Sequence, residues 1–381
     1  MHVTHLGLVD FRSYESVELD LSPGVTTFLG ANGRGKTNLI EALGYAATLR
    51  SHRVATDAPL VRQGAPRAIV RVRVDRDGRG TLIELEINPG RANRARLNRT
   101  AVPKQRDVLG LVTRVLFCPE DLTLVKGDPG DRRGYLDEVL VSLYPRFDGV
   151  LSDLDRVLRQ RNSLLKSASS LRGGGARSRA AAEQTLSVWD DQLAALSADV
   201  IAARSVLIER LAEPVAARYR TVAAADQDPG VLLEYACGVP DADRLDRGAI
   251  PDAVRSALAS RREEEFARGV TLVGPHRDEL AIGLNGMPVR GYASHGESWS
   301  MALALRLGAF DLLRSDAGAA GDPVLVLDDV FAELDAGRRQ RLAEAVQDVE
   351  QVLITAAAVE DVPAALVGRA VPMGDLVGAG T

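Results

Sequence analysis

The sequence has 381 residues, of which 46% are hydrophobic and 26% are charged, and its formal net charge is −5. A chain of this size can bury a substantial core and has room for about two or three domains. The negative net charge excludes a protein that is basic throughout, so any nucleic-acid binding must depend on a local basic patch.

Other classes are excluded by what the chain lacks. Cys118 and Cys237 are far apart and form no C-x-x-C pair, which argues against a disulfide framework and a zinc site. The first residues do not follow the basic-then-apolar order of a signal peptide. No apolar run reaches the roughly 18 residues of a membrane span. We therefore expect a cytoplasmic protein that does not bind membranes.

Residues 1–120 are predicted to form mostly short strands. Residues 25–29 are β-branched and aromatic and end at a glycine, which is typical of a strand. Residues 69–74 and 82–87 alternate apolar and charged side chains, which indicates half-buried antiparallel strands. Asp77-Gly78 lies between these two runs and predicts a hairpin turn.

A phosphate-binding loop follows the first of these strands. Residues 30–37 read Gly-Ala-Asn-Gly-Arg-Gly-Lys-Thr, match G-x-x-x-x-G-K-[ST], and precede a helical pattern. In this context the backbone N–H groups and the helix N-terminus face a phosphate. Lys36 is predicted to act in catalysis by reaching the β- and γ-phosphates, and Thr37 to bind Mg²⁺. The predicted nucleotide-binding residues of the loop are Gly30, Ala31, Asn32, Gly33, Arg34, Gly35, Lys36, Thr37 and Asn38.

The loop sequence has an alternative interpretation as a glycine turn that binds nothing. Two observations favour a nucleotide. The strand–loop–helix context is the one that the motif requires. Only four of the 47 basic residues are lysines, and one of the four is at this position of the motif.

From about residue 135 to 220 the pattern becomes helical. A heptad spacing follows the residues Leu186, Trp189, Leu193, Leu196, Val200, Ala203 and Leu207. The segment 167–178, with three glycines at its centre, separates this run from a preceding helical run. The pattern predicts a helical hairpin with a basic tip, which either packs flat on a domain or projects as a short arm.

Seven basic residues in this hairpin and its tip are candidates for DNA phosphate contacts. They are Arg156, Arg159, Arg161, Lys166, Arg172, Arg177 and Arg179. A solvated helical face is the alternative, and the sequence leaves both open. No base-reading motif is present, so sequence-specific recognition is not expected.

Residues 292–300, Tyr-Ala-Ser-His-Gly-Glu-Ser-Trp-Ser, resemble the nucleophile elbow G-x-S-x-G of serine hydrolases around Ser298. The second glycine is missing at position 300, and a helix-forming sequence follows in place of a strand-to-helix turn. A hydrolase is therefore disfavoured.

Paired aspartates end a late apolar run. Residues 324–327 are continuously apolar, as expected of a parallel strand that is buried on both faces, and residues 351–355 are similar. We predict that Asp328 lies at the end of a strand neighbouring the P-loop strand and binds Mg²⁺. Asp329 is predicted to be catalytic, by orienting or deprotonating the attacking water. This late position argues against a small-molecule P-loop kinase.

In combination these motifs resemble the RecF family of recombination-repair proteins, which are ABC-type ATPases related to SMC and Rad50 heads. The resemblance also includes residues 11–14, 51–53, 117–122, 126–129, 132–137, 273–278 and 328–335. It implies an α/β fold, a P-loop ABC-type ATPase head of mixed sheets and helices with an inserted, mainly helical lobe and short hairpin. We expect the head in residues 1–120 and 271–381, and the lobe in residues 121–270.

The resemblance identifies an ABC signature motif, S-x-G-(E/Q), at Ser294, Gly296 and Glu297, and a D-loop at Asp335. It implies that the signature contacts the γ-phosphate of ATP held by a second subunit, in an ATP-dependent homodimer. A serine hydroxyl and glycine N–H groups at a helix N-terminus suit a trianionic phosphate. Arg12 is a nucleotide contact by analogy, as is Arg53.

The resemblance further implies binding of ATP, Mg²⁺ and double-stranded or gapped DNA, and cooperation with RecO and RecR in loading RecA. It implies a weak, DNA-stimulated ATPase. Three positions depart from the usual ABC pattern: Asp329 replaces glutamate, Glu120 replaces the Q-loop glutamine, and residues 354–358 lack the switch histidine. Because aspartate is shorter by about 1.5 Å, we predict slow hydrolysis. An SMC-like structural head is the alternative, although the insertion has room only for a short hairpin.

Overall fold

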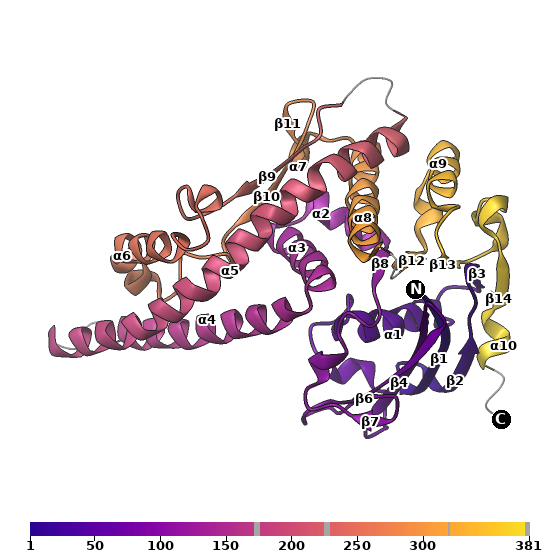
Figure 1. Cartoon of the computed structure of the whole chain (residues 1–381), viewed down its shortest axis with the longest axis horizontal. Coiled ribbons are helices and arrows are strands. Elements are labelled where there is room, and N and C mark those ends of the chain that lie inside the picture. Colours follow the sequence, from indigo (N-terminus) through magenta and orange to yellow (C-terminus); the bar gives the residue numbers. More distant parts are fainter. Residues whose placement is uncertain (171–175, 225–228, 319–320, 378–381) are drawn as a thin grey trace. The chain divides into compact units, whose positions relative to one another are not determined.

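The computed structural model describes residues 1–170, 176–224, 229–318 and 321–377, and the chain folds into two compact units (Figure 1). The first, called the head, comprises Met1–Lys126, Glu213–Val231 and Val289–Thr381. The second, called the lobe, comprises Gly127–Ala212 and Leu232–Pro288. These bounds differ from the expected ones in three segments: residues 121–126 and 213–231 belong to the head, and residues 271–288 belong to the lobe.

A parallel sheet forms the centre of the head. Its strands are β14 (Arg369–Pro372), β3 (Gly24–Leu29), β13 (Gln351–Ala356), β12 (Val324–Asp328) and β8 (Arg114–Phe117), in that order. Every residue of β12 and β13 is buried, as the continuous apolar runs predicted. One expectation was wrong: β13 lies between the P-loop strand β3 and the aspartate strand β12, so these two strands are not neighbours.

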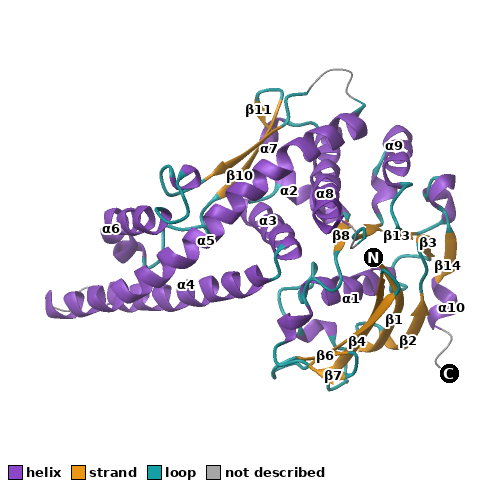
Figure 2. Ribbon diagram, viewed as in Figure 1, coloured by secondary structure: helices purple, strands orange, loops and turns teal. Residues whose placement is uncertain are grey.

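An antiparallel sheet forms the other layer of the head. Its strands are β2 (Tyr14–Asp20), β1 (His2–Phe11), β4 (Ala68–Arg76), β5 (Arg79–Ile87), β6 (Arg94–Leu97) and β7 (Thr100–Ala101). The predicted hairpin between β4 and β5 is confirmed, because Asp77 and Gly78 both adopt left-handed φ angles, 55° and 76°. Helix α1 (Lys36–Thr48) contacts strands of both sheets (Figure 2).

The rest of the head is helical. The helices are α2 (Thr123–Lys126), α7 (Val289–Tyr292), α8 (His295–Ala317), α9 (Ala336–Val346) and α10 (Met373–Val377). Helix α8 is 23 residues long and is buried along most of its length. None of the helices within the described residues is long and apolar enough to cross a membrane.

The lobe contains four helices and a small sheet within the described residues. The elements are α3 (Pro129–Leu143), α4 (Arg146–Ser170), α5 (Ala176–Ala223, continuing into the head), α6 (Ile250–Arg268), and the strands β9 (Leu232–Ala236), β10 (Glu279–Leu284) and β11 (Met287–Pro288). The predicted helical hairpin is present as α4 and α5 (Figure 1). Its tip lies partly outside the described residues.

The predicted heptad of α5 was partly wrong. Trp189, Leu196 and Ala203 are only half-buried, whereas the adjacent residues Asp190, Ser197 and Arg204 are buried. The prediction counted apolar residues only, and two of these polar side chains are buried with partners on other helices. Asp190 pairs with Arg161 of α4 and Arg262 of α6, and Arg204 pairs with Asp137 of α3. Helix α5 therefore packs within the lobe through ion pairs.

Arg161 lies at the centre of this network. Its side chain is fully buried, its Nε is 2.9 Å from Asp190 Oδ1, and its Nη2 is 2.5 Å from Glu265 Oε2. Its Nη1 donates to the Thr271 hydroxyl at 2.8 Å. The guanidinium thus compensates the buried charge of Glu265 and shares Asp190 with Arg262.

We predict that Arg161→Met lowers the free energy of unfolding of the lobe by about 3–5 kcal/mol, because Glu265 then keeps a buried charge without its cation. Arg159→Met is the matched control, since the Arg159 side chain is 71% exposed. We expect it to change stability by no more than about 0.5 kcal/mol. Urea denaturation followed by circular dichroism measures both, and equal effects of the two substitutions would contradict the buried network.

Candidate nucleotide-binding site

The P-loop joins β3 to α1, as predicted. Gly33 and Gly35 adopt left-handed φ angles of 82° and 93°, which side chains rarely allow. Gly35 is also the N-cap of α1, and a β-carbon there would lie 2.7 Å from the Tyr14 hydroxyl oxygen. The glycines therefore let the loop turn tightly and let Gly35 pack directly against Tyr14, the first residue of β2.

Lys36 folds back across the loop. Its Nζ is 2.7 Å from the Gly30 carbonyl oxygen, 3.3 Å from Asn32 Oδ1 and 3.8 Å from Asp329 Oδ1. The side chain is only 3% exposed. Lys36 thus brings a cation next to Asp329, the second of the paired aspartates at the end of β12.

Asp328 is buried at the end of β12. Its Oδ1 accepts a hydrogen bond from the Thr355 hydroxyl at 2.5 Å and lies 3.5 Å from Thr37 Oγ1. Burial raises the pKa of Asp328 to about 6, and the nearby carboxylates of Asp329 and Glu120 add to this while Thr355 opposes it. Glu120, the residue in the Q-loop position, is therefore close enough to act on Asp328 electrostatically.

The Thr37 hydroxyl and the Asp328 carboxylate are hard oxygen donors of the kind that Mg²⁺ prefers. The described residues contain no cluster of three or more His, Cys, Asp or Glu side chains that could hold a metal ion by themselves. This donor set fits Mg²⁺, which is commonly bound by one or two carboxylates together with substrate phosphates and water.

Thr355 is a site residue that the sequence prediction missed. It lies at the end of β13, where the sequence showed only that a histidine was absent. Its hydroxyl donates to Asp328 and accepts from the backbone N–H of Asp329 at 2.9 Å. Asp329 adopts a left-handed φ of 51° immediately after the strand, and Thr355 holds it in that turn. The sequence carried no motif that marks this threonine.

Glu41, in the second turn of α1, was also missed. Its side chain is fully buried and accepts two hydrogen bonds from Arg12, at 2.7 and 2.6 Å. Ser51 and Arg53 complete its shell at 2.5 and 3.3 Å. Burial alone would raise the pKa of Glu41, but these partners hold it below its usual value.

Arg12 and Arg53 therefore both form ion pairs with Glu41. Arg12 also donates to the Pro59 carbonyl oxygen at 2.9 Å, and Arg53 donates to Asn38 Oδ1 at 3.0 Å. Both side chains fix the start of α1 through Glu41 and Asn38. Their contact with nucleotide remains a prediction.

The predicted signature residues begin α8. Ser294 is the N-cap, its hydroxyl accepts from the Glu297 N–H at 3.3 Å, and its own N–H donates to Glu297 Oε2 at 2.8 Å. Hydrogen bonds from Ser294 lower the pKa of Glu297. This reciprocal capping box orients the serine at the positive end of a long helix.

His295 and Ser298 have structural partners. The Trp299 indole N–H donates to His295 Nε2 at 3.1 Å, and Lys126 Nζ is 3.4 Å from His295 Nδ1. Ser298 is fully buried, and its hydroxyl donates to the Ser294 carbonyl oxygen at 2.7 Å. The structure thus places Ser298 in the helix interior and excludes it as an exposed nucleophile.

Asp335, the predicted D-loop residue, is the N-cap of α9. Its Oδ1 accepts from the backbone N–H of Arg338 at 2.9 Å, and this bond lowers the pKa of Asp335. Within the described residues, no hydrogen bond or ion pair joins Ser294, Gly296, Glu297 or Asp335 to P-loop residues 30–38. One chain therefore carries the P-loop with its aspartates and, separately bonded, the signature with its D-loop.

The predicted DNA contacts have mixed outcomes. The prediction that Arg161 contacts DNA was wrong, because its side chain is buried among acidic residues. Arg156 and Arg159 are exposed on α4, where each pairs with an aspartate of the same helix, and Lys166 is exposed. Arg172 and the side chains of Arg177 and Arg179 lie outside the described residues. Charge spacing alone could not separate the buried arginine from the exposed ones.

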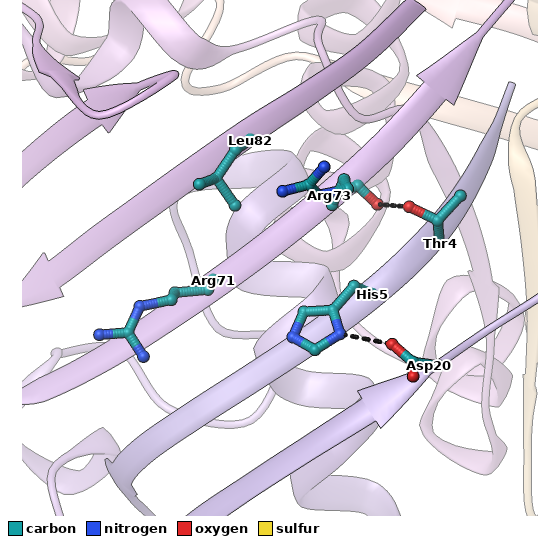
Figure 3. A pocket seen from close by; sticks show the side chains of 6 residues that line it. All are labelled: Thr4, His5, Asp20, Arg71, Arg73 and Leu82. Atoms are coloured by element: carbon teal, nitrogen blue, oxygen red, sulfur yellow. Dashed lines mark hydrogen bonds and ion pairs between the residues drawn. The ribbon is translucent and has the colours of Figure 1, made fainter. Parts of the chain in front are cut away.

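A hollow of about 490 Å³ lies elsewhere, on the outer face of the antiparallel sheet (Figure 3). His5 hydrogen-bonds Asp20 at 2.8 Å and Glu18 at 2.7 Å there, and Arg71 pairs with Glu84. Burial lowers the pKa of His5, but the two carboxylates outweigh it and raise the pKa overall. None of the predicted nucleotide-binding residues lines this hollow, which is an ion-paired sheet surface.

The fold and the site together define an ABC-type ATPase head. They combine a P-loop after β3, paired aspartates at the end of β12, a capped signature helix and a helical lobe inserted between the halves of the head. Comparison with known proteins narrows this class. Residues 2–368 match the family described as RecF/RecN/SMC N terminal domain. The chain is 56% identical over 379 residues to the DNA replication and repair protein RecF of Kineococcus radiotolerans, a match that covers 97% of this chain and 96% of that protein. It is 58% identical over 372 residues to the protein of the same name from Frankia alni, again with 97% and 96% coverage.

Solved structures of RecF and of a related head domain are similar to this chain in fold. A structure of the recombination mediator protein RecF with ATPrS, in the RecFOR pathway, is similar with a TM-score of 0.85 and 27% identity, over 95% of this chain and 94% of that one. An SMC head domain from Pyrococcus furiosus, at 17% identity and a TM-score of 0.50, is similar in fold alone. The chain belongs to the RecF family of DNA replication and repair proteins, which confirms the resemblance found in the sequence.

We predict that Thr355→Val lowers the rate of ATP hydrolysis by about 10- to 100-fold, because Asp328 and Asp329 then lack a shared hydrogen-bond partner worth about 1.5–3 kcal/mol. ATP binding should change less, since Thr355 bonds neither Lys36 nor the loop. Thr27→Val is the matched control: Thr27 is also fully buried, but its hydroxyl bonds the Val367 carbonyl oxygen at 2.8 Å. Equal reductions of turnover in both variants would show that Thr355 has only a structural role.

Proposed function

We propose that this protein is an ATP-dependent DNA-binding protein of recombinational repair, in which ATP closes two chains head to head. The observation that carries the proposal is that the signature and D-loop residues share no bond with the P-loop of their own chain within the described residues. A serine and glycine at a helix N-terminus suit a phosphate that another chain brings. The similarity to a RecF structure solved with ATPrS supports the choice of nucleotide.

In this mechanism Lys36 and the loop N–H groups hold the β- and γ-phosphates, while Thr37 and Asp328 hold Mg²⁺. When bound, Mg²⁺ neutralises charge on the phosphate oxygens.

The partner chain completes the site. Ser294 and Gly296 of the partner contact the γ-phosphate, and Asp335 crosses the same interface. Asp329 orients the attacking water, which it does less well than a longer glutamate would. ATP therefore acts mainly as a switch for dimerisation, and slow, DNA-stimulated hydrolysis releases the DNA.

The closed dimer binds double-stranded or gapped DNA through exposed basic residues of the hairpin. These are Arg156, Arg159 and Lys166, with Arg172, Arg177 and Arg179 as further candidates. Arg161 is removed from the set because it is buried.

Working with RecO and RecR, the protein helps to load RecA at gaps, and its place of action is the cytoplasm, on chromosomal DNA.

An SMC-like structural role is the alternative. The structure favours the repair role, because the insertion is a folded lobe in which α4 spans only 25 residues. At about 1.5 Å per residue this helix is roughly 37 Å long, too short for an extended coiled-coil arm.

The proposal predicts that a non-hydrolysable ATP analogue converts the monomer to a dimer, measured as mass in solution by light scattering. Lys36→Arg should weaken this conversion, whereas Asp329→Asn should keep ATP binding and prolong the dimer formed with ATP. A wild-type protein that binds the analogue and stays monomeric would contradict the proposal.

The same preparations, titrated with duplex DNA over a range of salt, test the DNA contacts. The triple variant Arg156→Ala, Arg159→Ala and Lys166→Ala should show a shallower slope of log K against log salt, by about 0.9 for each phosphate that these side chains neutralise. Arg261→Ala with Arg268→Ala is the matched control, because both arginines are exposed on α6, outside the hairpin. A salt-independent affinity would contradict phosphate binding.

A further inference from the structure

Arg338, in the first turn of α9, lies across the first turn of α8. Its Nε donates to the Ser300 hydroxyl at 3.0 Å, and its Nη1 forms an ion pair with Asp335. Its backbone N–H also donates to Asp335. One side chain therefore joins the signature helix to the D-loop residue.

Gly296 leaves the space that this guanidinium occupies. A β-carbon at position 296 would lie 2.5 Å from Arg338 Nη2, which is closer than real contacts allow, and 3.2 Å from its Cζ, so the guanidinium would have to shift. Gly296 and Ser300 are four residues apart and so lie on the same face of α8. The arginine thus packs over the glycine and bonds the serine one turn further on.

The electrostatics of this contact are finely balanced. A guanidinium at the positive end of a helix dipole is unfavourable by itself. The Asp335 carboxylate compensates it, and this carboxylate is 55% exposed, so it remains accessible to a partner. Arg338 is 24% exposed and is held at three points. Removal of the guanidinium therefore leaves Asp335 with its backbone capping bond but without its link to α8, and it does not open the hydrophobic core.

We propose that Arg338 is a positioning residue that couples the signature motif to the D-loop, so that Ser294 and Asp335 meet a partner chain as one rigid unit. Gly296 then has a second role beside close approach to a phosphate, because its missing side chain makes room for Arg338. The inference rests on the proposed function, in that both residues face a second chain. The inference adds a coupling, through Arg338, between the signature motif and the D-loop, and Arg338 belongs to neither motif.

A four-protein cycle tests the coupling: wild type, Gly296→Ala, Arg338→Ala and the double variant. The measured quantities are the dimer dissociation constant with a non-hydrolysable ATP analogue and hydrogen exchange at residues 333–338. Because alanine at 296 acts by displacing a flexible side chain, each single variant should weaken the dimer on the order of tenfold. The double variant should be weakened by clearly less than the product of the two single effects, because both substitutions remove the same Arg338 contact. Exchange should rise equally in all three variants.

Four further measurements separate a positioning role of Arg338 from a role in folding. Melting temperature and ATP affinity of the monomer should be unchanged in every variant. Arg338→Lys should fall between wild type and Arg338→Ala, because an ammonium cannot span both partners as the planar fork does. Arg341→Ala, on the same helix with its Nε bonded to the Val222 carbonyl oxygen at 2.8 Å, is the control that should leave the dimer intact.

Multiplied effects in the double variant, on the order of a hundredfold, would overturn the coupling and leave Gly296 with the phosphate role alone. An unchanged dimer in Arg338→Ala would overturn it as well. If wild type itself binds the analogue without dimerising, the proposed function fails and the coupling fails with it. The wild-type measurement therefore distinguishes the two failures.

Discussion

The nucleotide-binding site of the head depends on the interactions of one buried carboxylate, that of Asp328. It is placed by β12, held by the hydroxyl of Thr355 from β13, and faces Thr37 at the start of α1. Three segments that are far apart in the sequence must therefore be packed side by side before the site exists. The parallel order β3-β13-β12 achieves this, since the carboxyl ends of all three strands meet at one edge of the sheet. The energetic cost of burying the charge is acceptable where a cation completes the site.

The separation of the site into two halves follows from the same architecture. The P-loop and its aspartates are bonded to one another, and Ser300 of the signature helix is joined to Asp335 through Arg338. Each half is satisfied by its own hydrogen bonds, so each can be rigid in a single chain. In the proposed dimer, a nucleotide between two chains joins the P-loop of one chain to the signature helix of the other. The proposed dimerisation by ATP would therefore need no large rearrangement within either half.

Motifs with a local physical basis could be predicted from sequence. The P-loop, the hairpin at Asp77-Gly78 and the buried strand before Asp328 depend on neighbouring residues, and the structure contains all three. Residues whose role depends on distant partners could not be predicted. Thr355 and Glu41 look ordinary in sequence, Arg338 is one arginine among many, and Arg161 was taken for a surface charge because pattern does not reveal burial. The heptad of α5 failed for the same reason, since paired polar side chains occupy positions that hydrophobicity assigns to the surface.

The central claim is that each complete site needs two chains, and complementation between inactive variants tests it most directly. Lys36→Ala disables a P-loop, and Ser294→Arg disables a signature helix, so each variant alone should hydrolyse almost no ATP. In an equal mixture about half of the dimers are mixed, and each mixed dimer has one intact site of two. The account predicts that mixing restores about a quarter of the wild-type rate when the sites act independently. A mixture as inactive as its components, although both variants still dimerise with wild-type chains, would contradict it.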